Sequence, residues 1–397
     1  MVCYDATGMV FAFIFAAALV ACMGCSCAKV CDSRQRPGRR LAPPPRDDAR
    51  FPYFMSTTTG LWLFRRLWKP AEGTPVKAVV VFLHGYGEYI DRYDAAASVF
   101  ARSGIVFWGF DFEGHGRSDG ERGFVTEAGF DAFTDDAEQA LRLAARQFPG
   151  LPIFVMGHSL GGLVAVRLGA RLAKAAEAVD AEAGAPLFGR IKGFLLSAPA
   201  IEVDPAVAQP HLVFIARVLG SCMPRIRLGG IPAGDLSNNA TVNDHYSRDS
   251  MNNTRPFAAR FASGVLAATE AVPGIAADFT WPLLGMQDEG DKTTVPGACE
   301  RFVHTCGSPD AAFKLLRGRK HELFMADGYE DLITGTIMPW IEERCETAEP
   351  EAGGAAAAEA GLARDGMSGD RDDEAEPTDV DAVKTTTSEE PVLGAAV

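Results

Sequence analysis

A serine stands at the centre of a short glycine-bracketed motif whose residue types could make it a nucleophile. Ser159 lies in the run Gly157-His158-Ser159-Leu160-Gly161-Gly162, between a compact apolar stretch at 151–156 and an Ala- and Leu-rich pattern. The pattern predicts a strand, a sharp turn and a helix. A strained turn would expose the hydroxyl, and glycines two positions either side would avoid collisions inside it. The start of the helix would direct free N–H groups toward a developing oxyanion.

Nucleophilic serine chemistry also needs a base and an acid. The hydroxyl is a weak nucleophile unless a base removes its proton, and an acid must hold that base in the right tautomer. His321 follows a short expected strand at 313–316, and Asp291 lies in the loop after another at 282–286. We therefore expect His321 to be the base and Asp291 the acid. Asp288, three residues earlier in the same loop, is the alternative acid.

A second glycine-bracketed loop is expected to contribute a backbone donor. The near-continuous apolar run at 76–83 is typical of a strand buried on both faces, and it ends in His84-Gly85-Tyr86-Gly87-Glu88. A loop of this kind at the end of a central strand can supply a second N–H group to an oxyanion.

The remaining elements predict an α/β fold. Helical patterns at 91–102 and 130–148 alternate with apolar strands at 104–111 and 191–197, which favours a mostly parallel sheet with helices on both faces. The stretch at about 198–280 lacks buried-strand runs and carries helical apolar patches, so we expect a helical lid inserted over the site. A helix at 297–305 and a closing helix at 329–345 would complete the domain.

Composition excludes several classes of function. The chain has 397 residues and 47% hydrophobic content, enough for one large core. No basic patch with interleaved aromatic residues is present, so nucleic acid is not an expected partner. Five of the nine cysteines crowd the N-terminus, and no C-x-x-C pair recurs with zinc-like spacing, since Cys22-x-x-Cys25 lies in an apolar run. We expect neither a metal site nor a disulfide framework in the body.

The N-terminus predicts a membrane anchor over residues 1–31. Ala6 to Ala28 contains no charged residue, and its length suits a membrane-spanning helix. A cleaved signal peptide is the alternative, but it needs positive charge before the apolar run, where the only charged side chain is Asp5. Lys29 and several arginines follow the run, which places the body in the cytosol. Cysteines beside these bases, at 22, 25, 27 and 31, are either palmitoylation sites or small apolar helix residues.

Two polar segments flank the expected domain at 51–345. Residues 32–50 are rich in arginine and proline, which predicts an extended linker. Residues 346–397 hold 14 Asp or Glu against 3 Lys or Arg, so most of the formal charge of −14 lies there. With almost no aromatic residues, this tail is expected to be disordered.

Several motifs together resemble one enzyme family. They are Phe82 to Glu88 with Arg92-Tyr93, Asp111 with Gly114 to Ser118, the Ser159 motif, and Leu236-Ser237 with Asp244 to Asp249. As a set they are similar to the monoacylglycerol lipase and lysophospholipase branch of the α/β-hydrolases, of the S33 type, over roughly residues 51–344. Two positions depart from the pattern: Asp288 stands where the family usually has glycine, and Phe324 where animal monoacylglycerol lipases carry a histidine.

The resemblance implies roles for individual residues. Ser159, Asp291 and His321 would form the catalytic triad, and the N–H groups of Tyr86 and Leu160 the oxyanion hole. Glu88, Arg92 and Tyr246 would lie near the polar head of the substrate.

The sequence thus predicts a membrane-tethered serine hydrolase of single-chain lipid esters, either monoacylglycerol or lysophospholipid. It would work through an acyl-enzyme and need no cofactor. Acyl transfer from the same acyl-enzyme to an alcohol, and a non-catalytic binding protein with this fold, are the alternatives.

Overall fold

A computed structural model describes residues 52–178, 185–206 and 208–346. The predicted anchor, linker and acidic tail lie outside these residues. Among the helices that the structure describes, none is both long and apolar enough to cross a membrane.

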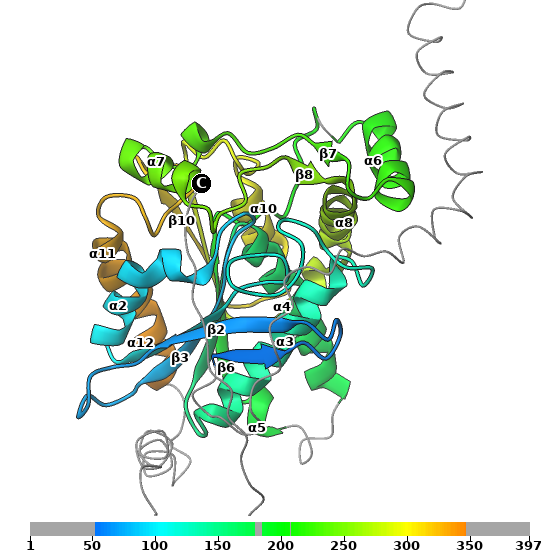
Figure 1. Ribbon diagram of the computed structural model, residues 1–397. Coiled ribbons are helices and arrows are strands. Elements are labelled where there is room, and N and C mark those ends of the chain that lie inside the picture. The colour runs from blue at the N-terminus through cyan, green and yellow to red at the C-terminus, as the bar shows by residue number, and fades with distance from the viewer. Residues whose placement is uncertain (1–51, 179–184, 207, 347–397) are drawn as a thin grey trace, which may run out of the picture.

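An eight-stranded sheet in the order β1-β2-β4-β3-β5-β6-β9-β10 forms the centre of the domain (Figure 1). The first two strands, β1 (Tyr53–Met55) and β2 (Trp62–Trp68), are antiparallel to their neighbours. The other six run parallel: β3 (Ala78–Leu83), β4 (Ile105–Phe110), β5 (Ile153–His158), β6 (Ile191–Ser197), β9 (Leu283–Asp288) and β10 (Ala311–Leu316). The predicted mostly parallel sheet is confirmed. Strand β1 was not predicted from the sequence, since three residues are too few for a readable pattern.

Two apolar layers cover the sheet, because alternate residues of its buried strands face opposite sides. Val79, Val81 and Leu83 of β3 pack with α3 (Asp131–Gln147), α4 (Leu160–Ala178) and α10 (Ala298–Thr305). Val80 and Phe82 face α2 (Asp94–Arg102) and the C-terminal helices. Those helices are α11 (Tyr329–Leu332), a π-helical turn at Ile333–Ile337 and α12 (Met338–Glu346), where the sequence indicated one closing helix. A short 3₁₀ turn, Ile90–Tyr93, precedes α2, and α5 (Ala185–Phe188) precedes β6.

An insertion between β6 and β9 lies over the C-terminal edge of the sheet, at the top of Figure 1. It contains α6 (Pro210–Cys222), α7 (Ala240–Arg248), α8 (Ala259–Glu270) and α9 (Val272–Ile275), with 3₁₀ turns at Ala233–Asp235 and Ala276–Asp278. Two-residue strands β7 (Arg227–Leu228) and β8 (Phe257–Ala258) pair within it. The insertion is largely helical, as expected. Whether it acts as a lid stays a prediction.

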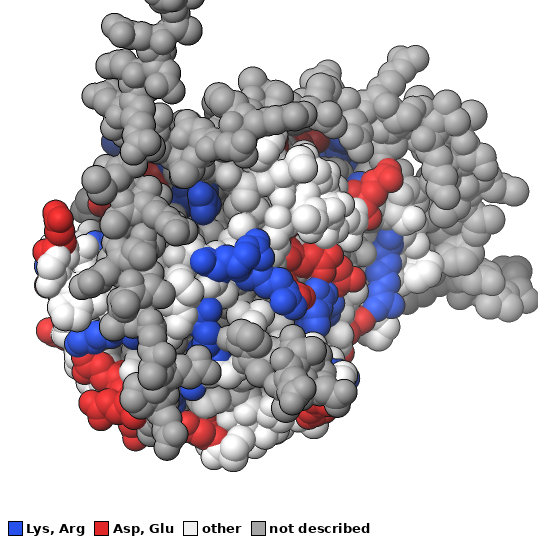
Figure 2. Space-filling view, turned by 90° about the horizontal axis from the view of Figure 1, so that it is seen from below, with Lys and Arg blue, Asp and Glu red and all other residues white. Residues whose placement is uncertain are grey.

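The opposite face of the molecule carries charges of both signs. Figure 2 views the domain from below, away from the insertion, and shows basic and acidic side chains interspersed where the surface is described. That part of the face offers no continuous basic area of the kind that nucleic acid requires.

Candidate active site

Ser159 occupies a strained turn between β5 and α4. Its φ angle is 52°, which is uncommon for a residue with a side chain. A Cβ at Gly157 would lie 2.3 Å from the Gly161 carbonyl oxygen, and a Cβ at Gly161 would lie 2.1 Å from that of Leu83. No side chain fits at either position. The predicted strand, sharp turn and helix are therefore present, with glycine required on both sides of the serine.

The His321 imidazole lines the same pocket as Ser159, and Asp291 contacts it at Nδ1. The distance from His321 Nδ1 to Asp291 Oδ2 is 3.1 Å, and both residues are buried. Asp291 also accepts hydrogen bonds from the N–H groups of Thr293 and Thr294 and from the Thr294 hydroxyl. Burial opposes ionisation of Asp291, but His321 and these donors outweigh it and lower the carboxyl pKa to about 2. Asp291 is therefore charged at neutral pH.

Asp288 has a different set of contacts. It is the last residue of β9 rather than part of the loop that the sequence suggested. One carboxylate oxygen accepts from the Gly290 N–H and the other from the Arg319 N–H, both at 2.9 Å. Asp288 thus joins the Asp291 loop to the loop that carries His321, without contacting the imidazole.

The two predicted oxyanion donors lie beside Ser159. Leu160 begins α4, and Tyr86 lines the pocket with Ser159. A Cβ at Gly85 would lie 3.2 Å from the Ser159 Cβ, so the loop that carries Tyr86 passes close to the serine. Across the residues that the structure describes, the N–H groups of Tyr86 and Leu160 donate to no other protein group. Both are available to a ligand.

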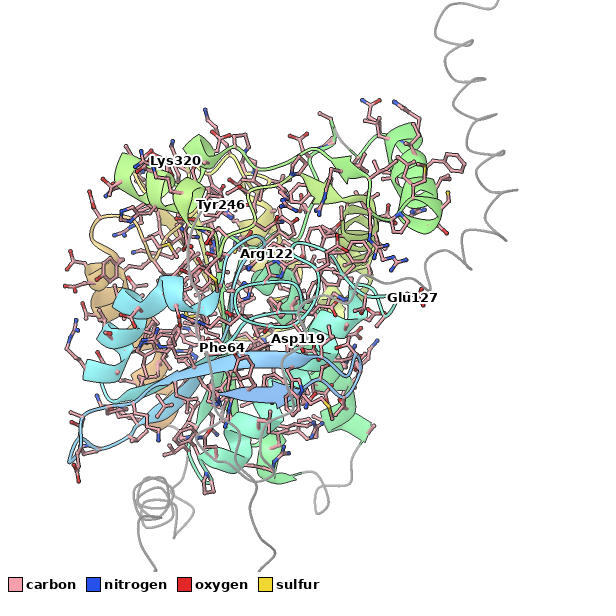
Figure 3. All side chains as sticks on the ribbon, viewed as in Figure 1. Phe64, Asp119, Arg122, Glu127, Tyr246 and Lys320 are labelled. Carbon is pink, nitrogen blue, oxygen red and sulfur yellow. The ribbon has the colours of Figure 1, made fainter. Side chains whose placement is uncertain are left out.

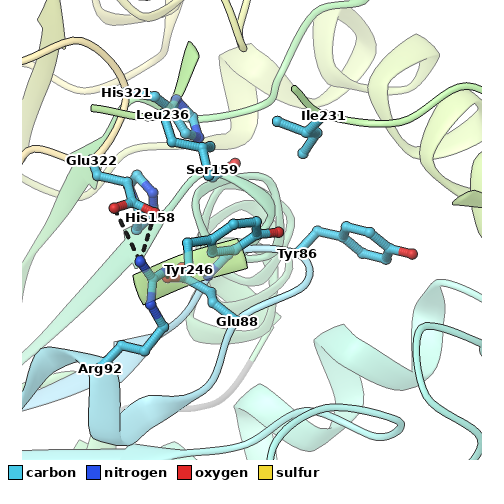
Figure 4. A pocket seen from close by; sticks show the side chains of 11 residues that line it. Tyr86, Glu88, Arg92, His158, Ser159, Ile231, Leu236, Tyr246, His321 and Glu322 are labelled. Carbon is cyan, nitrogen blue, oxygen red and sulfur yellow. Dashed lines mark hydrogen bonds and ion pairs between the residues drawn. The ribbon is translucent and has the colours of Figure 1, made fainter. Parts of the chain in front are cut away.

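A buried cluster of charges forms one wall of the pocket (Figure 4). Arg92 donates to Glu88 at 2.8 Å and contacts Glu322 at 2.9 Å. Glu88 also accepts from the Gly85 N–H at 2.5 Å and the Tyr93 hydroxyl at 2.6 Å. Although burial opposes its charge, the Arg92 guanidinium holds the pKa of Glu88 below its usual range. Glu88 therefore links Arg92 to the loop that contains Tyr86.

Tyr246 of α7 approaches the cluster from the insertion. The Arg92 guanidinium carbon lies 5.0 Å from the centre of the tyrosine ring, close enough for a cation–π contact. Tyr246 is buried and lines the pocket, as do Ile231 and Leu236 of the insertion. The three residues that the family resemblance associated with the polar head, Glu88, Arg92 and Tyr246, are therefore adjacent.

Two pocket residues with ionisable side chains, Glu322 and His158, were given no role from the sequence. Glu322 directly follows His321, but its partner Arg92 is 230 residues away, and one sequence carries no signal for such a pair. His158 places Nδ1 3.1 Å from the Ser197 carbonyl oxygen, and its ring centre is 4.7 Å from that of His321. Burial, with the charge of His321, lowers the pKa of His158 to about 4, so this imidazole is neutral at pH 7.

Within the described ranges, no group of three or more His, Cys, Asp or Glu side chains is arranged to hold a metal ion. The chemistry that the described side chains can perform is nucleophilic attack by a serine, with a paired histidine and aspartate to move its proton.

Comparisons with known proteins agree with this geometry. The family model described as serine aminopeptidase, S33, matches residues 74–327. Human monoglyceride lipase is 29% identical over 77% of this chain and 96% of its own length, and the rat enzyme is 30% identical over the same shares. A solved monoacylglycerol lipase from Paleococcus ferrophilus (23% identity) covers 71% of this chain and 99% of its own length, with a TM-score of 0.59. A monoglyceride lipase from Saccharomyces cerevisiae (21%) covers 76% and 99%, with a TM-score of 0.61. These two structures confirm the α/β-hydrolase fold, and the chain belongs to the serine aminopeptidase S33 family of α/β-hydrolases, in its monoacylglycerol lipase branch.

Proposed function

We propose that this protein is a serine hydrolase that cleaves carboxylic esters of single-chain lipids, monoacylglycerol or lysophospholipid, through an acyl-enzyme. The observation that carries the proposal is the His321–Asp291 hydrogen bond beside a serine held at positive φ. Relatives that match most of this chain are named as monoglyceride lipases, which supports the choice of a lipid ester.

The proposed reaction begins with the tautomer of His321. Because Asp291 is charged, it accepts a hydrogen bond from the Nδ1–H group of His321, which leaves Nε2 as the free base. Nε2 removes the Ser159 proton while Oγ attacks the ester carbonyl. The oxyanion of the tetrahedral intermediate accepts hydrogen bonds from the Tyr86 and Leu160 N–H groups. His321 then returns the proton to the leaving alcohol, and water releases the fatty acid by the same steps.

Glu88, Arg92 and Tyr246 are proposed to bind the polar head of the substrate, together with Glu322. All four line the pocket that contains Ser159. Since Arg92 is already paired with both carboxylates, a head group meets an ordered array of donors and acceptors rather than one unpaired charge. Such an array suits a hydroxylated head.

The insertion is proposed to act as a lid for a substrate that leaves a bilayer. Its helix α6 exposes large apolar side chains: Leu212 is 40% exposed and Phe214 52%. Met223, directly after the helix, is 44% exposed. Exposed apolar groups of this size favour contact with lipid. Closure would exclude water and strengthen the oxyanion contacts.

An N-terminal membrane anchor, with the domain in the cytosol, is part of the same proposal. The uncharged stretch from Ala6 to Ala28 and the basic residues after it support this arrangement. The anchor would hold the pocket near a membrane that contains its substrate.

Acyl transfer and a purely binding role receive less support than hydrolysis. No observation on the chain favours an acceptor alcohol over water. A binding protein has no need of a strained serine beside a paired imidazole.

Labelling with a fluorophosphonate probe, followed by assay of fatty-acid release from a monoacylglycerol, tests the function. We expect the wild type to be labelled and Ser159→Ala to be unlabelled. Ser159→Ala and His321→Ala should each lower kcat by about 10⁴-fold or more, and the double variant should lose little further. If the losses of the two single variants multiplied in the double variant, Ser159 and His321 would not act as one proton-transfer unit. Equal labelling of Ser159→Ala would identify a different nucleophile.

A further inference from the structure

Several hydrogen bonds hold the loop that carries Tyr86, and two of them come from one residue of the insertion. Gly85 donates its N–H to Glu88 at 2.5 Å. The Gly87 carbonyl accepts from the backbone N–H of Asn253 at 2.7 Å, and the Tyr86 hydroxyl accepts from Asn253 Nδ2 at 2.7 Å. Asn253 therefore binds both the backbone and the side-chain tip of this short loop.

Close packing accompanies these bonds. Asn253 is only 3% exposed. A Cβ at Gly123 would lie 2.0 Å from Asn253 Nδ2, and a Cβ at Gly87 would lie 2.7 Å from the Asn253 carbonyl oxygen. Both glycines also have positive φ, at 67° and 77°. The chain thus has glycine at the two places where any side chain would displace Asn253.

Residues 249–253, the segment after α7, are fixed by two further contacts. The Tyr89 hydroxyl donates to Asp249 at 2.6 Å. Arg122, on the loop beneath the insertion, donates to the Met251 carbonyl oxygen (Figure 3). The segment is therefore attached to Tyr89 and to the loop of Arg122 as well as to the Tyr86 loop itself.

The contacts of the Tyr86 side chain also restrict the position of its backbone. Its ring centre lies 4.2 Å from that of Phe261 at an interplanar angle of 31°, and Asn253 binds the hydroxyl at the far end. Burial raises the pKa of Tyr86 to about 12, so the hydroxyl stays protonated. A ring held at both its face and its tip restricts the position of the attached Cα and hence of the N–H.

We propose that Asn253 is a positioning residue for the oxyanion hole: it holds the Tyr86 N–H in the direction that the transition state requires. The inference rests on the proposed function. Oxyanion donors act only if they already point at the developing charge, and displacements of about 1 Å can cost about 10²-fold in rate. The residue that sets this geometry belongs to the insertion rather than to the sheet.

The test compares Asn253→Ala and Tyr86→Phe with the wild type on a soluble short-chain ester. Each removes the bond between the Asn253 side chain and the Tyr86 hydroxyl but keeps the Tyr86 backbone N–H. Tyr86→Phe also removes the longer contact, 3.5 Å, of the hydroxyl with the Gly123 carbonyl oxygen. We expect kcat to fall by about tenfold or more with KM within about twofold, because the oxyanion exists only after attack. Affinity for a trifluoromethyl ketone, which forms a tetrahedral adduct with the serine, should fall by the same factor. The double variant should lose no more than either single one.

Asn252→Ala is the matched control. Asn252 is also buried and bonded, through Nδ2, to the Tyr246 carbonyl oxygen, but it does not contact the Tyr86 loop. Its Tm should drop while kcat and ketone affinity stay at wild-type values. Equal kinetic losses in Asn252→Ala, or unchanged kinetics in Asn253→Ala and Tyr86→Phe, would overturn the proposal. If Asn253→Ala does not fold, Tyr86→Phe reports on the same bond from the other side. Failure of the proposed function would appear separately, as hydrolysis that survives Ser159→Ala.

Discussion

At the scale of single residues, the surroundings give two aspartates at the end of one strand different contacts. Asp291 accepts four hydrogen bonds, one of them from His321. Asp288 accepts two backbone N–H groups that join neighbouring loops. Spacing alone leaves both as candidates for the acid. The contacts favour Asp291, and its catalytic role remains a proposal.

Replacing each aspartate by asparagine tests the choice. Asp291→Asn should lower kcat by about 10⁴-fold, because the amide cannot hold His321 in the required tautomer. Asp288→Asn should lower kcat by less than about tenfold and act mainly on stability, since the amide oxygen still accepts one of its two bonds. Rates of ester hydrolysis and Tm of both variants give the comparison. A larger kinetic loss in Asp288→Asn would assign the acid to Asp288.

The sequence identified those site residues whose signal is local. Ser159 stands in a glycine-bracketed motif that predicts a sharp turn. Asp291 and His321 follow recognisable strands, in the expected chain order of serine, acid and base. Glu322 and Asn253 had no such signal, because their roles depend on Arg92 and Tyr86, which lie 230 and 167 residues away. Contacts of that range arise only when the chain has folded.

At the scale of elements, the insertion consists of parts with different attachments. Around α7 it is bonded to the site: the Leu236 carbonyl accepts from the His321 and Glu322 N–H groups, and Asn253 binds the Tyr86 loop. Helix α6 instead packs mainly on α8 and exposes apolar side chains. If the insertion opens without disturbing the oxyanion geometry, α6 would therefore move while α7 stayed in place. The sequence indicated helical patches at 211–219 and 257–268, which correspond to α6 and α8. It did not indicate α7, α9 or the strands β7 and β8, whose two residues each carry no periodicity.

The two glycosylation sequons in the insertion, Asn239-Ala240-Thr241 and Asn252-Asn253-Thr254, test on which side of a membrane the domain lies. Asn239 caps α7 through its side-chain oxygen and is only partly buried. Its nitrogen donates one N–H to Asp327 at 3.3 Å, which leaves the other position on the nitrogen for a glycan. Asn252 is buried, and a glycan there does not fit. Only Asn239 is therefore informative. If the domain lies in the cytosol, Asn239 should carry no glycan. Glycosidase treatment of the protein from eukaryotic cells should then cause no mass shift.

The control for that measurement is the same chain directed to the secretory lumen by an added signal peptide. It should gain a glycan at Asn239 that Asn239→Gln removes. A glycan on the unaltered protein would contradict the cytosolic placement.

At the scale of the whole molecule, the proposed catalytic residues all lie between residues 86 and 322, within one sheet and its insertion. Alternation of apolar runs and helical patterns predicted this domain, because buried parallel strands have a strong signal. The role of residues 1–50, which lie outside the described part, is argued from composition alone.

Removal of residues 1–50 separates catalysis from membrane delivery. A chain that begins at Phe51 should hydrolyse a soluble short-chain ester at the rate of the full-length protein, since no pocket residue is lost. On a long-chain monoacylglycerol in liposomes it should be slower, about 10²-fold if the tether raises the effective concentration at the surface as linked modules do. Parallel assays on both substrates give the ratio. Equal losses on both would place the N-terminal residues within the fold.

The order of the elements along the chain also has a consequence for the proposed activity during synthesis. Strands β3, β4, β5 and β6, which surround the serine turn, are complete once residue 197 has been translated. Asn253, the proposed acid Asp291 and the proposed base His321 all follow, on segments that contact this early core. In a ribosome-bound chain, the Ser159 turn can therefore form long before the residue proposed to remove the serine proton has been synthesised. Hydrolysis of membrane lipid would start only when synthesis is nearly finished, so nascent or C-terminally truncated chains would be silent.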